Sequence, residues 1–157
     1  MVASYQAKLK QPQRQTAPRT EEFMSRSFVT VSPEDDIYHV ISLLLKNKIT
    51  AAMVVDQFNK LVGVVSEKDC LALAAHETYE HNTLPGGKVL NFMTRQVVSV
   101  SPDAGMNEVA NLFIQHPFKK LPVLDNTGHL VGVVRRHDVL EVIQDYYMKS
   151  MAFISKQ

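Results

Sequence analysis

The feature that most constrains this chain is an internal repeat: residues 23–71 recur at residues 92–140 with a constant offset of 69 and no gap. Phe23-Met24 returns as Phe92-Met93, and the apolar run at 61–65 returns unchanged at 130–134. A repeat of fixed period is one supersecondary unit used twice. A unit of about 50 residues exposes too much surface to hold a core alone. We therefore expect the two copies to bury their apolar faces against each other.

Composition supports one compact domain and gives no overall attraction to nucleic acid. The chain has 157 residues, of which 45% are hydrophobic and 21% charged, with a net charge of +1. The first 20 residues carry four basic side chains and no acid, which leaves the remainder at −3. The single cysteine, Cys70, cannot form an internal disulfide, and no apolar run approaches the ~20 residues of a membrane span. We expect a cytoplasmic protein with no membrane partner.

The repeat also predicts the domain organisation. Residues 1–20 offer almost no large apolar side chains to offset their ordering entropy, so we expect a flexible basic tail. We then expect the first repeat at 21–76, a linker at 77–88, the second repeat at 89–148 and a C-terminal tail at 149–157.

Each copy has the pattern of strand, helix, strand, strand and helix, which predicts an α/β (α+β) fold. In the first copy, a helical turn at 20–24 precedes a short strand at 29–31, and Ser32 and Pro33 suit the start of the next helix. Near-continuous apolar runs at 52–55 and 61–65 are typical of strands covered on both faces, with a turn over 56–60. The closing helices are predicted at 67–75 and 136–148.

The most specific motif lies where the third strand meets the closing helix. It runs from Gly63 to Ser66 and Asp69 in the first copy, and from Gly132 to Arg135 and Asp138 in the second. Glycine lets another backbone or a ligand approach closely, and a helix N-terminus offers unpaired amides. A hydroxyl and a carboxylate three residues apart can both face a sugar diol, as in ribose binding. The same spacing matches a capping box, which explains both residues without a ligand.

This doubled pattern resembles a pair of cystathionine-β-synthase (CBS) domains over about residues 20–148. The resemblance rests on Met24, Val31-x-Pro33, the run at 53–56 and the motif at 63–69, together with the copy at 121–138. It implies two βαββα units packed through their sheets as a pseudo-twofold-symmetric module. It further implies two equivalent clefts that bind adenine nucleotides or related adenosyl ligands, with no obligatory cofactor.

The resemblance also implies which residues bind the ligand. Asp69 would hold the ribose with Ser66 beside it, and Asp138 would be its counterpart in the other cleft. The base would lie against the first strand, at 29–31 or 97–99, and the start of the second, at 51–53 or 120–122. The candidates around the base are Val29, Thr30, Ala51, Ala52, Met53, Val98 and Pro122, and those around the phosphates are Lys119, Lys120, Arg135, Arg136 and His137.

One departure from the family pattern separates the two clefts. Arg135 stands where the first copy has Ser66, so the second cleft lacks a hydroxyl partner for the ribose. Arginine supplies instead a forked, permanently charged donor that suits phosphate, although a solvated arginine beside a helix start would also fit. We therefore expect the Ser66/Asp69 cleft to be the better nucleoside site, and the charge at 135–137 to favour a phosphorylated ligand.

The leading interpretation is a regulatory module that binds AMP, ADP, ATP or S-adenosylmethionine and transmits its occupancy to an unidentified partner protein. No Walker loop, nucleophile elbow or Rossmann fingerprint is present, so we expect no enzymatic activity. In the segment from His76 to His81 the second histidine falls at i+5, off the i, i+4 face that chelates zinc, so no metal site is expected.

Apolar residues beyond the needs of one small core predict a homodimer. They include Leu43, Leu44 and Leu45 and the apolar residues at 146–154, although core burial would also account for them. Two alternatives for the function remain. One is a dimerisation or protein-interaction module without functional nucleotide sites, and the other is a nucleic-acid binder that uses the basic tail, which no basic recognition helix supports.

Overall fold

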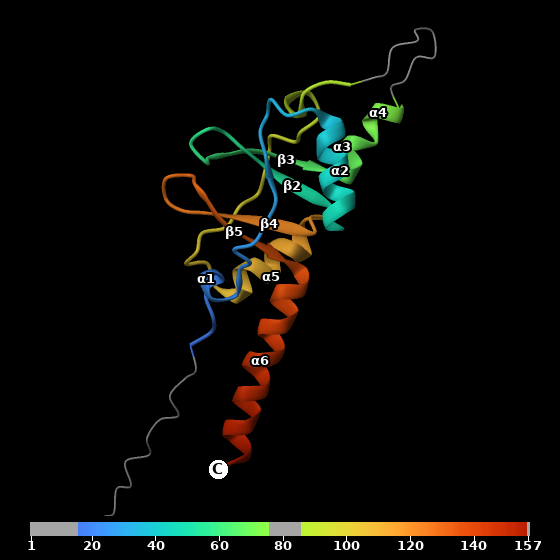
Figure 1. Ribbon diagram of the computed structural model, residues 1–157. Coiled ribbons are helices and arrows are strands. Elements are labelled where there is room, and N and C mark those ends of the chain that lie inside the picture. Colours follow the sequence, from blue (N-terminus) through green and yellow to red (C-terminus); the bar gives the residue numbers. More distant parts are fainter. Residues whose placement is uncertain (1–15, 76–85, 157) are drawn as a thin grey trace, which may run out of the picture.

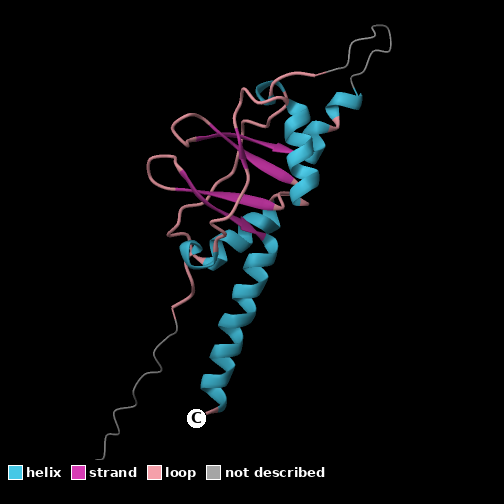
Figure 2. Ribbon diagram, viewed as in Figure 1, coloured by secondary structure: helices cyan, strands magenta, loops and turns pink. Residues whose placement is uncertain are grey.

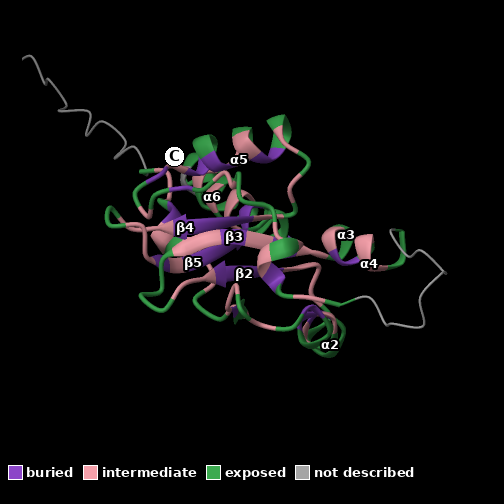
Figure 3. Cartoon of the chain, turned by 90° about the horizontal axis from the view of Figure 1, so that it is seen from above, coloured by how far each residue is buried: buried purple, intermediate pink, exposed green. Residues whose placement is uncertain are grey.

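The computed structural model describes residues 16–75 and 86–156. Within these ranges each repeat forms a small β-sheet, and helices lie on its outer side (Figures 2 and 3). Most of the expected basic tail and most of the expected linker lie outside the described residues, as does the segment from His76 to His81.

The first repeat follows the predicted order of elements. Its elements are α1 (Thr20–Phe23), β1 (Thr30–Val31), α2 (Ile37–Asn47), β2 (Ala51–Val55) and β3 (Leu61–Ser66). β1 runs parallel to β2, and β2 runs antiparallel to β3, so the sheet has the order β1-β2-β3. Where one closing helix was expected, the chain forms two short ones, α3 (Glu67–Cys70) and α4 (Ala72–Ala75).

The second repeat departs from the prediction at both ends. Its elements are a 3₁₀ helix at Val89–Asn91, α5 (Met106–Gln115), β4 (Lys120–Leu124), β5 (Leu130–Arg135) and α6 (Arg136–Ser155). The strand expected at 97–99 does not form, and Val100 alone bridges in parallel to Val123.

The prediction of a C-terminal tail from residue 149 is wrong, because α6 continues to Ser155. The sequence offers no reason to stop at 148: residues 149–155 contain neither glycine nor proline and include the good helix formers Lys149, Met151 and Ala152. Figure 1 shows the far end of α6 standing away from the rest of the molecule.

The start of α2 also differs from the prediction. Ser32 and Asp35 form a turn of their own, in which the Ser32 amide donates to the Asp35 carboxylate at 2.8 Å. The helix begins four residues later than expected, with Asp36 as its N-cap, because the Asp36 carboxylate accepts a hydrogen bond from the Tyr38 amide at 2.8 Å. Aspartate is as good an N-cap as serine, so the local sequence allowed either start.

The N-terminal segment of each repeat, residues 18–25 and 87–94, packs on the other repeat and is here called the exchanged segment. In residues 18–25, the Thr20 amide donates to the Ala104 carbonyl at 2.8 Å, and Ser25 exchanges two backbone hydrogen bonds with Val133, at 2.8 and 2.9 Å. In residues 87–94, Thr94 makes the same exchange with Val64, at 2.9 and 2.8 Å. Because these contacts recur at the offset of 69, the two halves are related by an approximate twofold axis.

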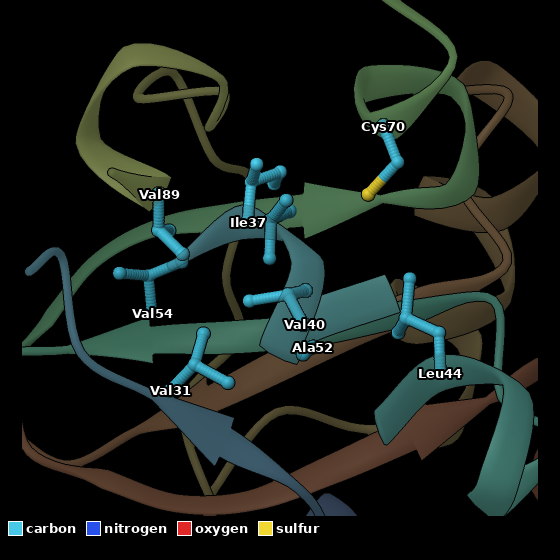
Figure 4. Packing of buried hydrophobic residues seen from close by; sticks show 9 residues of the cluster. Val31, Ile37, Val40, Leu44, Ala52, Val54, Cys70 and Val89 are labelled. Carbon is cyan, nitrogen blue, oxygen red and sulfur yellow. The ribbon is translucent and has the colours of Figure 1, made fainter. Parts of the chain in front are cut away.

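This exchange completes the hydrophobic cores. The first core is built from β1, α2, β2, β3 and α3, and Val89 enters it from the exchanged segment with no exposed surface (Figure 4). Phe23 and Met24 pack in the same way against the core of the second repeat. A third cluster, formed by Met53, Leu130 and Val133, joins the two repeats. The predicted burial of one copy against the other is confirmed.

Glycine in the repeated motif serves this packing and not a ligand. A methyl group added at Gly63 would lie 2.9 Å from the Thr94 carbonyl oxygen and 2.9 Å from the sulfur of Met93. At the equivalent Gly132, the nearest atom to such a methyl group is the sulfur of Met24. Each glycine therefore makes room for the exchanged segment of the other repeat.

We predict that Gly63→Ala lowers the free energy of unfolding by about 1–3 kcal/mol, because the new methyl group forces the Thr94 backbone away from β3. Urea unfolding measures the change. The control is Gly86→Ala, where the nearest atom, in the Tyr38 ring, lies 3.5 Å from the added carbon. The control should shift stability by less than about 0.5 kcal/mol, and equal midpoints for wild type and Gly63→Ala would contradict the account.

Candidate functional site

Two cavities lie between the repeats, and both are lined by Ala51, Met53 and Lys120. The first, here the Asp69 cavity, has a volume of about 470 Å³. Its walls are the start of β2, the end of β3 and the first turn of α3 from one repeat, with residues 94–98 and 117–122 from the other. The second, here the Arg135 cavity, has about 400 Å³ and is lined by Ser25, Ser27, Phe28, Val29, Asn47, Ile49, Val133 and Arg135 besides the three shared residues.

Ser66 and Asp69 form a capping box at the start of α3. Oδ2 of Asp69 accepts hydrogen bonds from the Ser66 amide at 2.9 Å and from the Ser66 hydroxyl at 3.0 Å. The Asp69 amide in turn donates to the Ser66 hydroxyl oxygen at 3.2 Å. The capping interpretation is therefore confirmed, but it uses only one oxygen of the Asp69 carboxylate.

The other oxygen of Asp69 meets the exchanged segment. Oδ1 accepts from the Thr94 hydroxyl at a long 3.3 Å, and both residues line the cavity. A contact of this length is weak. Oδ1 of Asp69 and the Thr94 hydroxyl therefore lie side by side in a wall to which both repeats contribute. Two neighbouring hydroxyl groups of a ligand could form hydrogen bonds with this pair.

Two basic side chains of the second repeat, Lys119 and Lys120, also line the Asp69 cavity. Lys119 is exposed, and Lys120 is half-buried with its ammonium nitrogen 3.5 Å from the Ala51 carbonyl oxygen. Burial lowers the pKa of Lys120, and the nearby charge of Arg135 lowers it further. An anionic group between these lysines would reverse part of that shift, because it favours the protonated form.

The equivalent carboxylate in the second repeat is fully engaged. Oδ2 of Asp138 accepts from the Arg135 amide at 2.8 Å and from its Nε at 3.1 Å, while Oδ1 accepts from Nη2 at 2.7 Å. Burial acts to raise the pKa of Asp138, but the hydrogen bonds and charge of Arg135 outweigh it and hold the pKa below its usual range. The pseudo-symmetric prediction required Asp138 to line the Arg135 cavity. Asp138 is not among the residues that line it, so this prediction is wrong.

Ten of the fifteen predicted binding residues line one or both cavities, and five line neither. The Asp69 cavity brings together eight of them: Ala51, Met53, Ser66, Asp69, Val98, Lys119, Lys120 and Pro122. The Arg135 cavity adds Val29 and Arg135. Thr30, Ala52, Arg136, His137 and Asp138 line neither cavity.

The geometry of the strands and helices explains why these predicted residues lie outside the cavities. Ala52 points to the opposite face of β2 from Ala51 and Met53 and is buried in the first core. Thr30 is exposed, next to buried Val31. At the first positions of α6, Arg136 lies over the Phe113 ring, with its guanidinium carbon 6.0 Å from the ring centroid. His137 contacts Glu141, with 2.9 Å between Nε2 and Oε1.

Sequence reasoning missed the residues that the exchanged segments bring to the cavities. Thr94 and Gln96 line the Asp69 cavity, and Ser25 and Ser27 line the Arg135 cavity. A signal for one pair was present, because Ser25 and Thr94 are hydroxyl residues at equivalent positions of the repeat, each directly after a Phe-Met pair. Nothing in the local sequence showed that each would face the other repeat.

The single cysteine lacks the character of a nucleophile. Cys70 is buried, and burial together with the charges of Asp69 and Glu67 raises the pKa of its thiol, so the reactive thiolate is disfavoured. Residues 16–75 and 86–156 contain no cluster of three side chains able to hold a metal ion. No helix in this described part has the length and apolar character needed to cross a membrane.

A family model described as the CBS domain matches the chain twice, at residues 21–76 and 89–145. The chain belongs to the CBS domain family. Both matches coincide with the two repeats, so the resemblance inferred from the sequence is confirmed, as is the mixed α and β fold built from two CBS repeats.

Known proteins of several kinds are similar to this chain. An uncharacterized protein from Methanocaldococcus jannaschii is 31% identical over 143 residues, which cover 73% of this chain and 85% of that protein. The crystal structure of CBSX2, a CBS-pair protein from Arabidopsis thaliana, superposes with a TM-score of 0.74 at 28% identity, covering 85% of this chain and 99% of that one.

Two similar structures contain nucleotides. A structure of CBSX2 in complex with AMP matches with a TM-score of 0.71 at 28% identity, over 81% of this chain and 96% of that chain. The cytosolic domain of the Mg²⁺ channel MgtE, in complex with ATP, matches with a TM-score of 0.66 at 30% identity, over 79% of this chain and 48% of that chain.

Several curated relatives are much longer than the region of similarity. Inosine-5'-monophosphate dehydrogenase from Methanocaldococcus jannaschii is 29% identical over 129 residues, but these cover only 24% of the enzyme. The activity of that enzyme therefore gives no ground for assigning a reaction to this chain.

Proposed function

We propose that this protein is a regulatory module that binds an adenine nucleotide in the Asp69 cavity. The observation that carries the proposal is the position of Asp69, whose Oδ1 faces Thr94 of the other repeat across a cavity of about 470 Å³. In this binding mode the ribose hydroxyls donate to Oδ1, the base lies against Val98 and Met53, and the phosphate meets Lys119 and Lys120. The AMP and ATP complexes of similar CBS structures support this ligand class.

The charge of the cavity favours a phosphorylated ligand over S-adenosylmethionine. Lysines 68, 119 and 120 outnumber the acids Glu67 and Asp69 among its lining residues. A phosphate is therefore attracted to these lysines, whereas the positive sulfonium of S-adenosylmethionine is repelled by them. Of these ligands, AMP is the smallest that offers both a ribose to Asp69 and a phosphate to the lysines, and ADP and ATP add further phosphates.

Regulation follows from the shared construction of the cavity. The ligand would touch both repeats, so it would stabilise the arrangement of the repeats that closes best around it. A partner protein that binds one arrangement better than the other would then respond to occupancy. The protein acts in this proposal by binding in the cytoplasm and not by catalysis.

We predict that Asp69→Asn weakens AMP binding by about 10- to 100-fold, because it removes a charged acceptor worth about 1.5–3 kcal/mol per hydrogen bond. A thermal-shift titration followed by calorimetry measures the loss. The matched control is the pseudo-equivalent Asp138→Asn, which removes a carboxylate that lines neither cavity and should leave AMP affinity within about threefold of wild type. Equal AMP affinity in wild type and Asp69→Asn would refute the ribose contact, and no response to any adenine nucleotide would favour the interaction-only alternative.

A homodimer is the assembly that the exposed apolar residues fit best. Leu45 and Ile114 occupy equivalent positions in the two repeats and are 74% and 81% exposed, and Leu71 and Leu140 form a second such pair at 67% and 63%. The approximate twofold axis therefore repeats the same apolar positions on both sides of the molecule. A second copy of the chain offers the same pattern and can cover both sets at once.

We predict that light scattering gives about twice the mass of one 17.7 kDa chain. Leu140→Glu should shift the population toward the single chain, because it places a charge in the apolar contact. The control is Phe58→Glu, which changes an exposed apolar residue in the β2–β3 turn and should leave the mass unchanged. A wild-type mass of one chain at micromolar concentration would exclude the dimer.

A further inference from the structure

Two cations lie directly opposite each other on neighbouring strands of the second repeat. Lys120 at the start of β4 pairs in register with Arg135 at the end of β5. In the first repeat the equivalent pair is Ala51 and Ser66, which carry no charge. Like charges on directly opposed residues of a sheet destabilise it. The second repeat therefore holds an unfavourable pair that the first shows to be unnecessary for the fold.

The cavity beside these cations has the character of an anion site. Among its described lining residues none is acidic, and Lys120 and Arg135 contribute two positive charges. The Ser25 hydroxyl already donates to the Ser27 carbonyl oxygen at 3.0 Å. The Asn47 side-chain amide donates to the Leu43 carbonyl oxygen at 2.9 Å, which leaves its second N–H for a ligand. The cavity, at about 400 Å³, is large enough for a phosphate or pyrophosphate group. No carboxylate of the described residues faces this cavity to hold a ribose, because Asp138 is not among the lining residues and both its oxygens accept from Arg135.

Asp138 neutralises the charge of Arg135 but forms no ion pair with Lys120. It accepts from the Arg135 backbone amide, Nε and Nη2, and hydrogen bonding with this carboxylate raises the pKa of Arg135. Lys120 forms no ion pair within the described residues, and its ammonium group makes one long contact to the Ala51 carbonyl oxygen. The cavity thus retains a net positive charge after the internal pair is formed.

We propose that the Arg135 cavity binds a phosphate-type anion through Lys120 and Arg135, without a ribose contact, and that this anion and a nucleotide in the Asp69 cavity oppose each other's binding. The second half of the proposal rests on the proposed function, whereas the anion site does not. Lys120 lines both cavities, so its one ammonium group serves two anions. Two anions on either side of one cation also repel each other, and both effects reduce joint occupancy.

The anion site is tested by calorimetric titration of the full chain with pyrophosphate at low ionic strength. We expect one site per chain, and a loss of affinity of about tenfold or more in Lys120→Gln and in Arg135→Ser, since each removes a charged donor. Arg135→Ser restores the residue that caps α3 in the first repeat, so it should fold. The control Lys149→Gln removes an equal charge on exposed α6 and should bind as wild type does.

Two outcomes of this titration would overturn the anion site. One is pyrophosphate binding that Lys149→Gln weakens as much as Lys120→Gln, which would indicate nonspecific attraction. The other is an equal loss in Lys119→Gln, because Lys119 lines only the Asp69 cavity and the anion would then bind there.

The coupling is tested by repeating nucleotide titrations in saturating pyrophosphate. AMP should bind about fivefold or more weakly, whereas adenosine, which has no phosphate near Lys120, should change by less than about twofold. In Lys120→Gln the effect on AMP should disappear. Unchanged AMP affinity in wild type would overturn the coupling.

The source of the anion is distinguished by stoichiometry. A second AMP per chain that is lost in Arg135→Ser would support the phosphate site and identify a nucleotide as its ligand, whereas one AMP with one pyrophosphate supports a free anion. A second adenosine per chain would overturn the proposal, because it shows a nucleoside contact in the Arg135 cavity. If pyrophosphate binds and no adenine ligand does, the proposed function fails while the anion site stands.

Discussion

The reciprocal exchange of the N-terminal segments of the two repeats holds the fold together. Ser25 bonds to Val133 and Thr94 to Val64, while Met24 and Met93 lie against Gly132 and Gly63. Neither repeat completes its core without the segment that belongs to the other in sequence. Because each repeat gives a segment to the other, both cavities are lined by residues of both repeats, and a ligand in either one would contact both.

Differences at equivalent positions of the repeat make the two cavities chemically different. Ser66 caps α3 and leaves one oxygen of Asp69 at the cavity wall, whereas Arg135 occupies both oxygens of Asp138. The first cavity therefore offers an acceptor to a sugar, and the second offers positive charge to an anion. Lys120 lies between them and lines both. The two repeats thus form two similar cavities whose linings differ in charge and in hydrogen-bonding capacity.

The sequence predicted those features that local patterns determine. The 69-residue offset, the apolar periodicity and the turn residues identified most helices and strands, and the Ser66-x-x-Asp69 spacing identified the capping box. Features that depend on long-range contacts were missed. The approach of Thr94 to Asp69 requires the exchanged segment, and the pairing of Arg135 with Asp138 depends on a side-chain direction that spacing does not determine. Arg136 and His137 were placed at a cavity because of their charge, but the first turn of α6 directs them elsewhere.

Mapping the amide chemical shifts of the labelled protein during titration with adenosine shows whether the nucleoside binds where Asp69 faces Thr94. Adenosine carries the base and ribose but no phosphate, so it isolates the contact that the account assigns to this cavity. If the ribose binds at Asp69, saturable shifts will appear at residues 66–69 and 94–98, with little change at residues 25–29 and 135–138. Equal shifts in both sets, or shifts confined to the second, would contradict it.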